Sequence, residues 1–185
     1  ESVAAPKSVL ITVNAGHIPS DHWTQDINIG GGRIIGECCH FIDLARFYVG
    51  VPIKSVQSSA MRANGMEATP PDSVTICLQF VDGSMATIVY LANGPSSFPK
   101  ERVEIFTDGK LLQLDNFRRL RGFGWRGFTK MNLFSQDKGQ TSSVLEFCDS
   151  LRSGGECIPA DEIFEVTRFT LDAANALSVN HASFD

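Results

Sequence analysis

The sequence predicts a single α+β domain built on a largely antiparallel, open sheet of about six strands, with helices packed on one face. Two β-rich pairs of segments are joined by the tight-turn dipeptides Asp82-Gly83 and Asp108-Gly109, which indicates consecutive hairpins. The helical patterns lie outside this block, one before it and two after it, so strands and helices do not alternate as in a parallel sheet. The 185 residues suffice for one full-sized core, and we expect residues 1–185 to form one domain.

The first third of the chain predicts a strand, a long loop, a helix and a second strand. The β-branched segment 7–16 indicates the first strand. The loop after it is rich in turn-forming residues and long enough to suggest a functional role. Apolar residues recur at helical spacing over 33–48, and a glycine and a proline then end the helix. The next strand is expected over 53–63.

The hairpin over 74–91 predicts how the sheet is used. Alternation in its two strands gives one strongly apolar side, which we expect to consist of Val74, Ile76, Leu78, Phe80, Met85, Val89 and Leu91. The other side mixes polar and apolar residues, namely Thr75, Cys77, Gln79, Ala86, Ile88 and Tyr90. Because the helices can cover only one face, we expect another copy of the chain to bury the second face, giving a homodimer or higher oligomer.

The last third predicts an irregular excursion and two helices. Residues 117–139 are basic and aromatic without a clear period, which is typical of a long connection. Such a segment can stack on sugar rings and hold phosphates, or it can serve as an interface loop. Thr141 or Ser142 is expected to cap the first helix, and Pro159 to begin a longer one that runs to about Val179.

Charge and cysteine usage exclude several classes of protein. The net charge is -5 and the pI about 5.3, which argues against a general nucleic-acid or anionic-membrane binder. The five cysteines are an odd number without CxxC spacing, which predicts free thiols, a reducing compartment and a cytoplasmic location. The chain begins without a methionine or a signal sequence, so we expect it to be cut from a longer protein.

The segment GGGRIIGECCHFID, residues 30–43, gathers the most chemistry. On a regular helix, Arg33, Glu37 and His40 share one stripe, and Asp43 lies one turn beyond. A histidine flanked by carboxylates can hold a proton near neutral pH, as a general acid or base must. On residue types alone, a solvated helix face with a His40 to Asp43 hydrogen bond is the commoner explanation.

A metal site is not expected in this segment. The adjacent residues Cys38 and Cys39 point about 100° apart on a helix, so they cannot both reach one ion together with His40. No second cluster in the sequence has zinc-ligand spacing. We therefore predict that no metal is bound.

Residues 22–47, HWTQDINIGGGRIIGECCHFIDLARF, resemble the Gfo/Idh/MocA family of oxidoreductases, and the order of elements is similar to that of its C-terminal domain. The resemblance implies the substrate-binding half of an NAD(P)-dependent dehydrogenase that acts on a hydroxyl or carbonyl of a sugar, polyol or related small molecule. It implies that an N-terminal Rossmann domain, absent from this chain, binds NAD or NADP, so the chain alone should be inactive and bind no cofactor. It also implies catalytic roles for His40 and Asp43, and substrate-binding roles for His22, Trp23, Arg33, Glu37 and Arg126.

Two departures from the family pattern keep an alternative open. Many members have an aspartate four residues before the histidine, where this chain has Gly36, and Glu37 follows one residue later on another side of the helix. Cys38 stands where a glycine is common. No GxGxxG motif is present in the chain. The alternative is a non-catalytic ligand-binding or assembly domain derived from the family.

Overall fold

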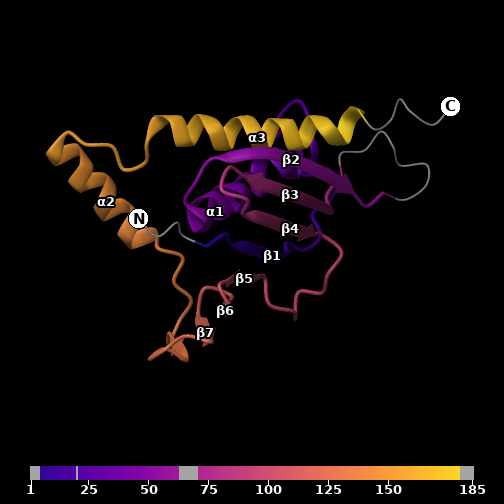
Figure 1. Ribbon diagram of the computed structural model, residues 1–185. Helices are drawn as coiled ribbons and strands as arrows, with labels where there is room; N and C mark the ends of the chain where they lie inside the picture. Colours follow the sequence, from indigo (N-terminus) through magenta and orange to yellow (C-terminus); the bar gives the residue numbers. More distant parts are fainter. Residues whose placement is uncertain (1–4, 20, 63–70, 180–185) are drawn as a thin grey trace.

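The computed structural model describes residues 5–19, 21–62 and 71–179 (Figure 1). Within these described residues, eight strands form one sheet in the order β2-β3-β4-β1-β5-β6-β7-β8, and only β1 and β4 run parallel. The α+β prediction is confirmed, with eight strands in place of about six. The strands are β1 (Ser8–Asn14), β2 (Ile53–Ala60), β3 (Val74–Phe80), β4 (Met85–Leu91), β5 (Glu101–Thr107), β6 (Lys110–Asp115), β7 (Arg119–Phe123) and β8 (Lys130–Asn132).

Two helices cover one face of this sheet. A short π-helix, η2 (Ile34–Cys38), leads directly into α1 (Cys39–Val49), which packs on β1 and β4. The C-terminal helix α3 (Ala160–Val179) packs on β2 and α1. A third helix, α2 (Gln140–Ser153), stands off from the sheet (Figure 1). No helix among the described residues is long and apolar enough to cross a bilayer.

The core lies between the sheet and these two helices. Branched side chains of β1, β3 and β4 form one cluster with the apolar side chains of α1, and burying each one contributes about 1.5–3 kcal/mol. The side chains with 1% exposure or less include Val9, Ile11, Val13, Ile42, Ala45, Ile76 and Ile88. Polar contacts fix the helix ends. Arg46 of α1 pairs with Glu162 and Glu165 of α3, and the Lys7 ammonium donates to the last carbonyls of α1.

Both predicted hairpins are present, but the faces of the first were assigned wrongly. The register pairs Ile76 with Ile88 and Leu78 with Ala86, and directly paired residues point to the same side. Ala86, Ile88 and Tyr90 therefore face the helices, while Met85, Val89 and Leu91 lie on the open face. The strand β4 is apolar on both sides, so alternation alone could not set its register against β3.

The prediction of an irregular excursion over 117–139 is also wrong in part, because β7 and β8 extend the sheet there. Asn116 and Phe117 make the turn after β6 with positive φ, a conformation that asparagine adopts more often than most residues but phenylalanine rarely does. Charge pairs then replace apolar alternation as the cross-strand contacts. Asp115 accepts from Arg102 of β5 at 2.8 Å and from Arg121 of β7 at 3.0 Å.

The remaining boundaries differ only slightly from those predicted. The N-cap of α2 is Gly139, at φ 78°, and not Thr141 or Ser142. The Asp137 carboxylate accepts from the Gly139 amide, which turns the chain earlier than a hydroxyl cap would. The second strand ends at Ala60, and residue 63 of its predicted span lies outside the described residues. The long C-terminal helix begins and ends as predicted.

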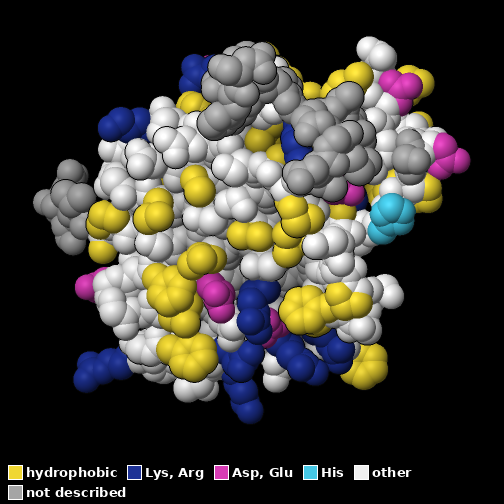
Figure 2. Space-filling view, turned by 90° about the vertical axis from the view of Figure 1, so that its right-hand side faces the viewer, with side chains coloured by type: hydrophobic (Ala, Val, Ile, Leu, Met, Phe, Trp, Pro, Cys, Tyr) yellow, Lys and Arg dark blue, Asp and Glu magenta, His cyan; other side chains and the backbone are white. Residues whose placement is uncertain are grey.

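The open face of the sheet has an apolar part and a charged part (Figure 2). Its apolar part comprises Leu10, Met85, Val89, Leu91, Phe106, Leu111 and Phe123, which the strand register places on one side. Basic side chains gather over β6, β7 and β8, along the lower part of the view in Figure 2. They include Arg119, Arg121 and Lys130, which the same register places on this face. Among the described elements, no helix covers this side (Figure 1).

Candidate active site

The loop between β1 and the helix folds tightly onto the helix start. His22 caps the short 3-10 helix η1 (Trp23–Gln25), and its ring lies 5.8 Å from the Trp23 ring. A Cβ on Gly30 would lie 2.6 Å from the Trp23 carbonyl oxygen, so only glycine permits this approach. His22 and Trp23 are both exposed, Trp23 to 60%. They border the helix start, as substrate-binding residues there would.

The π-helix changes which residues share a side. The Cys39 amide donates to the Ile34 carbonyl, five residues back, which shifts residues 34–38 relative to a regular helix. Arg33 is only 1% exposed and donates to the Gly16 carbonyl at 2.8 Å. Arg33 therefore does not share an exposed stripe with His40, contrary to the regular-helix spacing. Such π-turns occur often at functional sites.

Glu37 joins a network that sequence patterns did not reveal. Its Oε2 accepts a short hydrogen bond from the Tyr90 hydroxyl and lies 3.5 Å from Nη2 of Arg33. The Arg33 guanidinium stands 5.1 Å from the centroid of the Tyr90 ring. Burial raises the pKa of Tyr90, and the bond to Glu37 raises it further, so the hydroxyl stays protonated and donates. Tyr90 could have been found only with the correct register of β4.

His40 and Asp43 lie on the outer side of α1, both exposed. Partial burial of its carboxyl raises the pKa of Asp43, and repulsion from Glu162 adds to this. His40 and Arg46 act in the opposite direction and favour the carboxylate. The site thus offers an exposed histidine near an exposed carboxylate whose charge it influences.

The two cysteines of this segment do not add chemistry. Cys38 is fully buried in the core, and burial strongly raises the pKa of its thiol. Burial also raises the pKa of Cys39. Both sulfurs therefore remain neutral thiols, which are poor ligands and nucleophiles. Within the described ranges, no three His, Cys, Asp or Glu side chains come together as a metal site would require.

A second polar pair lies in line with Tyr90 across the sheet. Val13 of β1 is paired with Tyr90 on one side and with Glu101 on the other. Glu101 is 4% exposed, and its Oε1 accepts from the Lys138 ammonium at 2.6 Å. Tyr90 and Glu101 stand two strands apart, about 10 Å at normal strand spacing. Lys138 lies in the segment DKGQ, residues 137–140, which has no local pattern that predicts this ion pair.

Arg126 is not brought to this site. It is exposed in the connection between β7 and β8, and β7 is the third strand beyond β1 in the sheet. At normal spacing that is about 14 Å from β1, before any distance along the strand. Arg126 thus belongs to the basic region over β6 to β8, separate from His40.

The sequence profile of the GFO/IDH/MocA C-terminal domain matches residues 6–111, which is more than half of the chain. The chain belongs to this family. The matched region includes the His40 segment, the first hairpin with Tyr90, and the second hairpin only as far as the start of β6. No curated protein sequence matched this Gfo/Idh/MocA C-terminal domain.

Solved structures share the fold of this Gfo/Idh/MocA domain at low sequence identity. UDP-N-acetylglucosamine 3-dehydrogenase GnnA from Acidithiobacillus ferrooxidans is 16% identical with a TM-score of 0.73, over 95% of this chain and 55% of that one. Aldose-aldose oxidoreductase from Caulobacter crescentus is 16% identical with a TM-score of 0.72, over 96% and 55%. An oxidoreductase domain protein from Kribbella flavida is 17% identical with a TM-score of 0.74, over 96% and 58%. This chain thus spans a little over half the length of each.

Proposed function

We propose that this domain is the substrate-binding half of an NAD(P)-dependent oxidoreductase acting on a hydroxyl or carbonyl of a sugar, polyol or related molecule. The observation that carries the proposal is the outward-facing pair His40 and Asp43, beside a Glu37 held by Tyr90 and Arg33, in a chain of this oxidoreductase family. The proposed substrate class is supported by the names of two proteins that share the fold, a UDP-N-acetylglucosamine 3-dehydrogenase and an aldose-aldose oxidoreductase.

The chain's own residues account for the proton in such a reaction. Oxidising an alcohol removes a proton from its oxygen and a hydride from its carbon. His40 accepts the proton, and Asp43 stabilises the imidazolium that forms and orients the ring. In the reverse direction, His40 returns the proton to the forming alkoxide. A positioned group of this kind contributes about 10²–10⁴ to the rate.

The described residues of this chain do not form a binding site for NAD or NADP, the hydride acceptor of such a reaction. The parallel pair β1 and β4 lacks a glycine-rich turn that leads straight from strand to helix and could cradle a diphosphate. NAD or NADP is therefore assigned to a Rossmann domain outside these 185 residues, which would be a partner of this domain within one polypeptide.

A second candidate is a non-catalytic binding or assembly domain. One observation favours it. The aspartate that many family members carry is replaced by Gly36, and the neighbouring carboxylate of Glu37 is bound by Tyr90 and Arg33 within the domain. In that case His40 would only border a ligand pocket. The two candidates differ in whether removing His40 changes turnover or only affinity.

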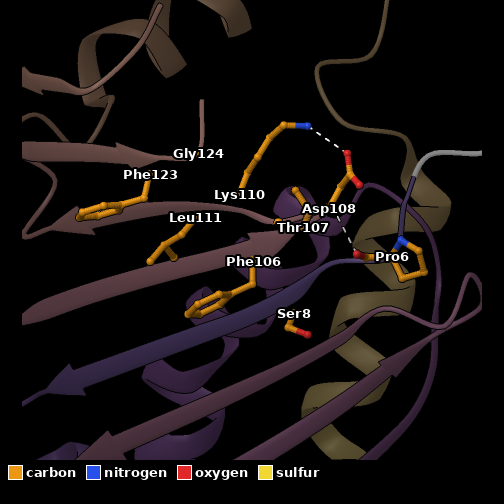
Figure 3. A pocket seen from close by; sticks show the side chains of 10 residues that line it. Pro6, Ser8, Phe106, Thr107, Asp108, Lys110, Leu111, Phe123 and Gly124 are labelled. Atoms are coloured by element: carbon orange, nitrogen blue, oxygen red, sulfur yellow. Dashed lines mark hydrogen bonds and ion pairs between the residues drawn. The ribbon is translucent and has the colours of Figure 1, made fainter. Parts of the chain in front are cut away.

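We further propose that the open face of the sheet binds a second copy of the chain. Leu10, Met85, Phe106 and Phe123 are each 40–52% exposed there. Covering apolar area is favourable by about 25 cal/mol per Å2 before association costs are subtracted. A hollow of about 500 Å3 at one border of this face, beside the β5–β6 turn, lies between Phe106, Leu111 and Phe123 and could receive partner side chains (Figure 3).

The function is tested with the protein expressed together with any coding sequence upstream of Glu1. Reduction of NAD⁺ or NADP⁺ is followed by absorbance with a panel of nucleotide sugars, aldoses and inositols. The 185-residue chain alone is titrated calorimetrically with both dinucleotides. We expect turnover by the longer protein and no binding by the chain alone. Micromolar dinucleotide binding by the chain alone would contradict the proposal that another domain binds the cofactor.

A further inference from the structure

The outer side of α3 carries a short stripe of exposed residues in the order acid, aromatic, base. The buried residues Val166 and Ala173 mark the inner side of the helix. At about 100° per residue, Asp161, Phe164 and Arg168 fall within about 40° of the direction opposite to Val166. All three are exposed, Phe164 to 71%. In Figure 1, no described element lies on the outer side of α3, so this stripe is available for contact.

The two charges of this stripe have no opposite charge within the described part of the chain. The neighbouring carboxylates of Glu162 and Glu165 point toward α1, where they pair with Arg46. Asp161 joins no ion pair among the described residues, and the Arg168 guanidinium lies over an adjacent aromatic ring, 4.6 Å from its centroid. A partner can thus supply an opposite charge to both without breaking an existing ion pair.

A hollow of about 350 Å3 lies beside the stripe. Its lining combines the start of β2 with the first half of α3, namely Pro52, Ile53, Asp161, Phe164, Glu165 and Arg168. The wall from β2 is apolar, and the wall from α3 carries both charges that lack a partner. Such a hollow suits an aromatic side chain that brings an acid and a base with it. The α3 stripe itself has this composition.

The stripe is complementary to itself when two copies of α3 run antiparallel. With a twofold axis just after Phe164, Asp161 lies about 5 Å along the helix on one side of the axis, and Arg168 about 5 Å on the other. Each Asp161 then faces the Arg168 of the second copy, and the two Phe164 rings meet at the centre. Ile158 and Leu171, which are 46% and 44% exposed, add apolar area at the two ends of this stretch.

We propose that the outer side of α3 binds the same side of a second copy of the chain. Each Phe164 ring sits in the hollow of the other copy, flanked by two ion pairs between Asp161 and Arg168. This contact is on the helix side of the sheet and is separate from the open face proposed above (Figure 1). A chain that uses both contacts forms a tetramer of two dimers. The inference does not depend on the oxidoreductase chemistry, so failure of one leaves the other standing.

The test reverses the charges in the longer protein and measures the mass by sedimentation over a range of concentrations. Asp161→Arg alone, or Arg168→Asp alone, places like charges opposite each other twice in the pair. We expect either change to weaken the association by about tenfold or more. The double variant Asp161→Arg with Arg168→Asp should regain the association, because opposite charges again face each other. An equimolar mixture of the two single variants should regain it as well, since one chain then offers two bases and the other two acids.

Phe164→Ser should also weaken the association by about tenfold or more and leave the unfolding midpoint unchanged, since this side chain is 71% exposed. Val144→Ser in α2, where the valine is 61% exposed, is the matched control and should leave the mass unchanged. Equal masses for the unmodified protein and the three single variants in α3 would overturn the inference. So would a loss that neither the double reversal nor the mixture restores, because the stripe would then bind a different surface, such as another domain of the longer protein.

Discussion

The helices α1 and α2 have similar apolar stripes and opposite surroundings. In α1, Ile42 and Ala45 are completely buried against the sheet. In α2, Leu151 keeps 67% of its surface exposed. The difference shows that an amphipathic pattern predicts a helix and a contact, but not whether the contact lies within the same chain. The inner side of α1 packs on the sheet, which leaves its outer side exposed and able to bind a ligand. In α2, by contrast, no side is buried against the described part of the chain.

The difference between the two helices is tested by truncating one apolar side chain of each helix in the isolated chain. Ile42→Ala should lower the free energy of unfolding by about 2–5 kcal/mol, since it opens a cavity in the core. Leu151→Ala should change it by no more than about 0.5 kcal/mol, as expected for an exposed position. Urea unfolding followed by circular dichroism measures both. Equal losses would mean that α2 packs on the rest of the chain in solution.

The outer side of α1 is tested by His40→Ala in the longer protein. Turnover should fall by about 100-fold or more, because a positioned acid or base is lost. Dinucleotide affinity and the unfolding midpoint should not change, since His40 is exposed and outside the core. His17→Ala, in the loop after β1, is a control for the loss of an imidazole. Unchanged turnover would favour the non-catalytic candidate.

The link between the inner and outer sides of α1 is tested by Tyr90→Phe. Removing the hydroxyl leaves the Glu37 carboxylate with Arg33 alone, which should cost about 1–3 kcal/mol of stability. If Glu37 helps to position the site, the pH profile of turnover should shift as well. Tyr48→Phe removes a partly buried hydroxyl elsewhere on α1 and serves as the control. A loss of stability with an unchanged pH profile would limit Glu37 to a structural role.

The smallest expected effect concerns Asp43. Its pKa is raised above the ordinary 3.8, so the folded state favours the protonated carboxyl, and this contribution is lost as the pH rises through the folded pKa. Asp43→Asn should therefore stabilise the domain slightly at pH 7 and leave it unchanged at pH 3. Thermal unfolding at the two pH values measures this. A destabilised variant at pH 7 would show that attraction to His40 and Arg46 outweighs burial.

The parts of the fold with strong local signals could be predicted from the sequence. Asp108-Gly109 supplies the positive φ angles of its hairpin turn, and Pro159 marks the start of α3 within one residue. The strand β7 could not be predicted, because its contacts are the charge pairs of Asp115, which depend on the folded register. For β4, apolar residues on both sides left two registers equally plausible.

The candidate site was predictable only in its exposed part. His40 and Asp43 lie on the outer side of the helix as the spacing predicts, since α1 is regular from Cys39 onward. Before that point the π-turn breaks the 3.6-residue period, and no residue type in the sequence announces it. The Tyr90 to Glu37 bond joins residues 53 positions apart, and the Lys138 to Glu101 pair joins residues 37 apart. Such contacts depend on tertiary structure and leave no local pattern.

The position of β1 has a consequence for how the chain reaches this fold. β1 is first in the sequence but lies in the middle of the sheet, where Ser8 is opposite both Met85 and Phe106. The units β2-β3-β4 and β5 to β8 each consist of neighbours in sequence, so each can form early, whereas β1 must wait for both. During synthesis on the ribosome, its apolar residues stay without a partner until about a hundred further residues have emerged. The first strand made is thus the last to be placed, and the interval before it inserts is when this domain is most open to aggregation and to chaperones.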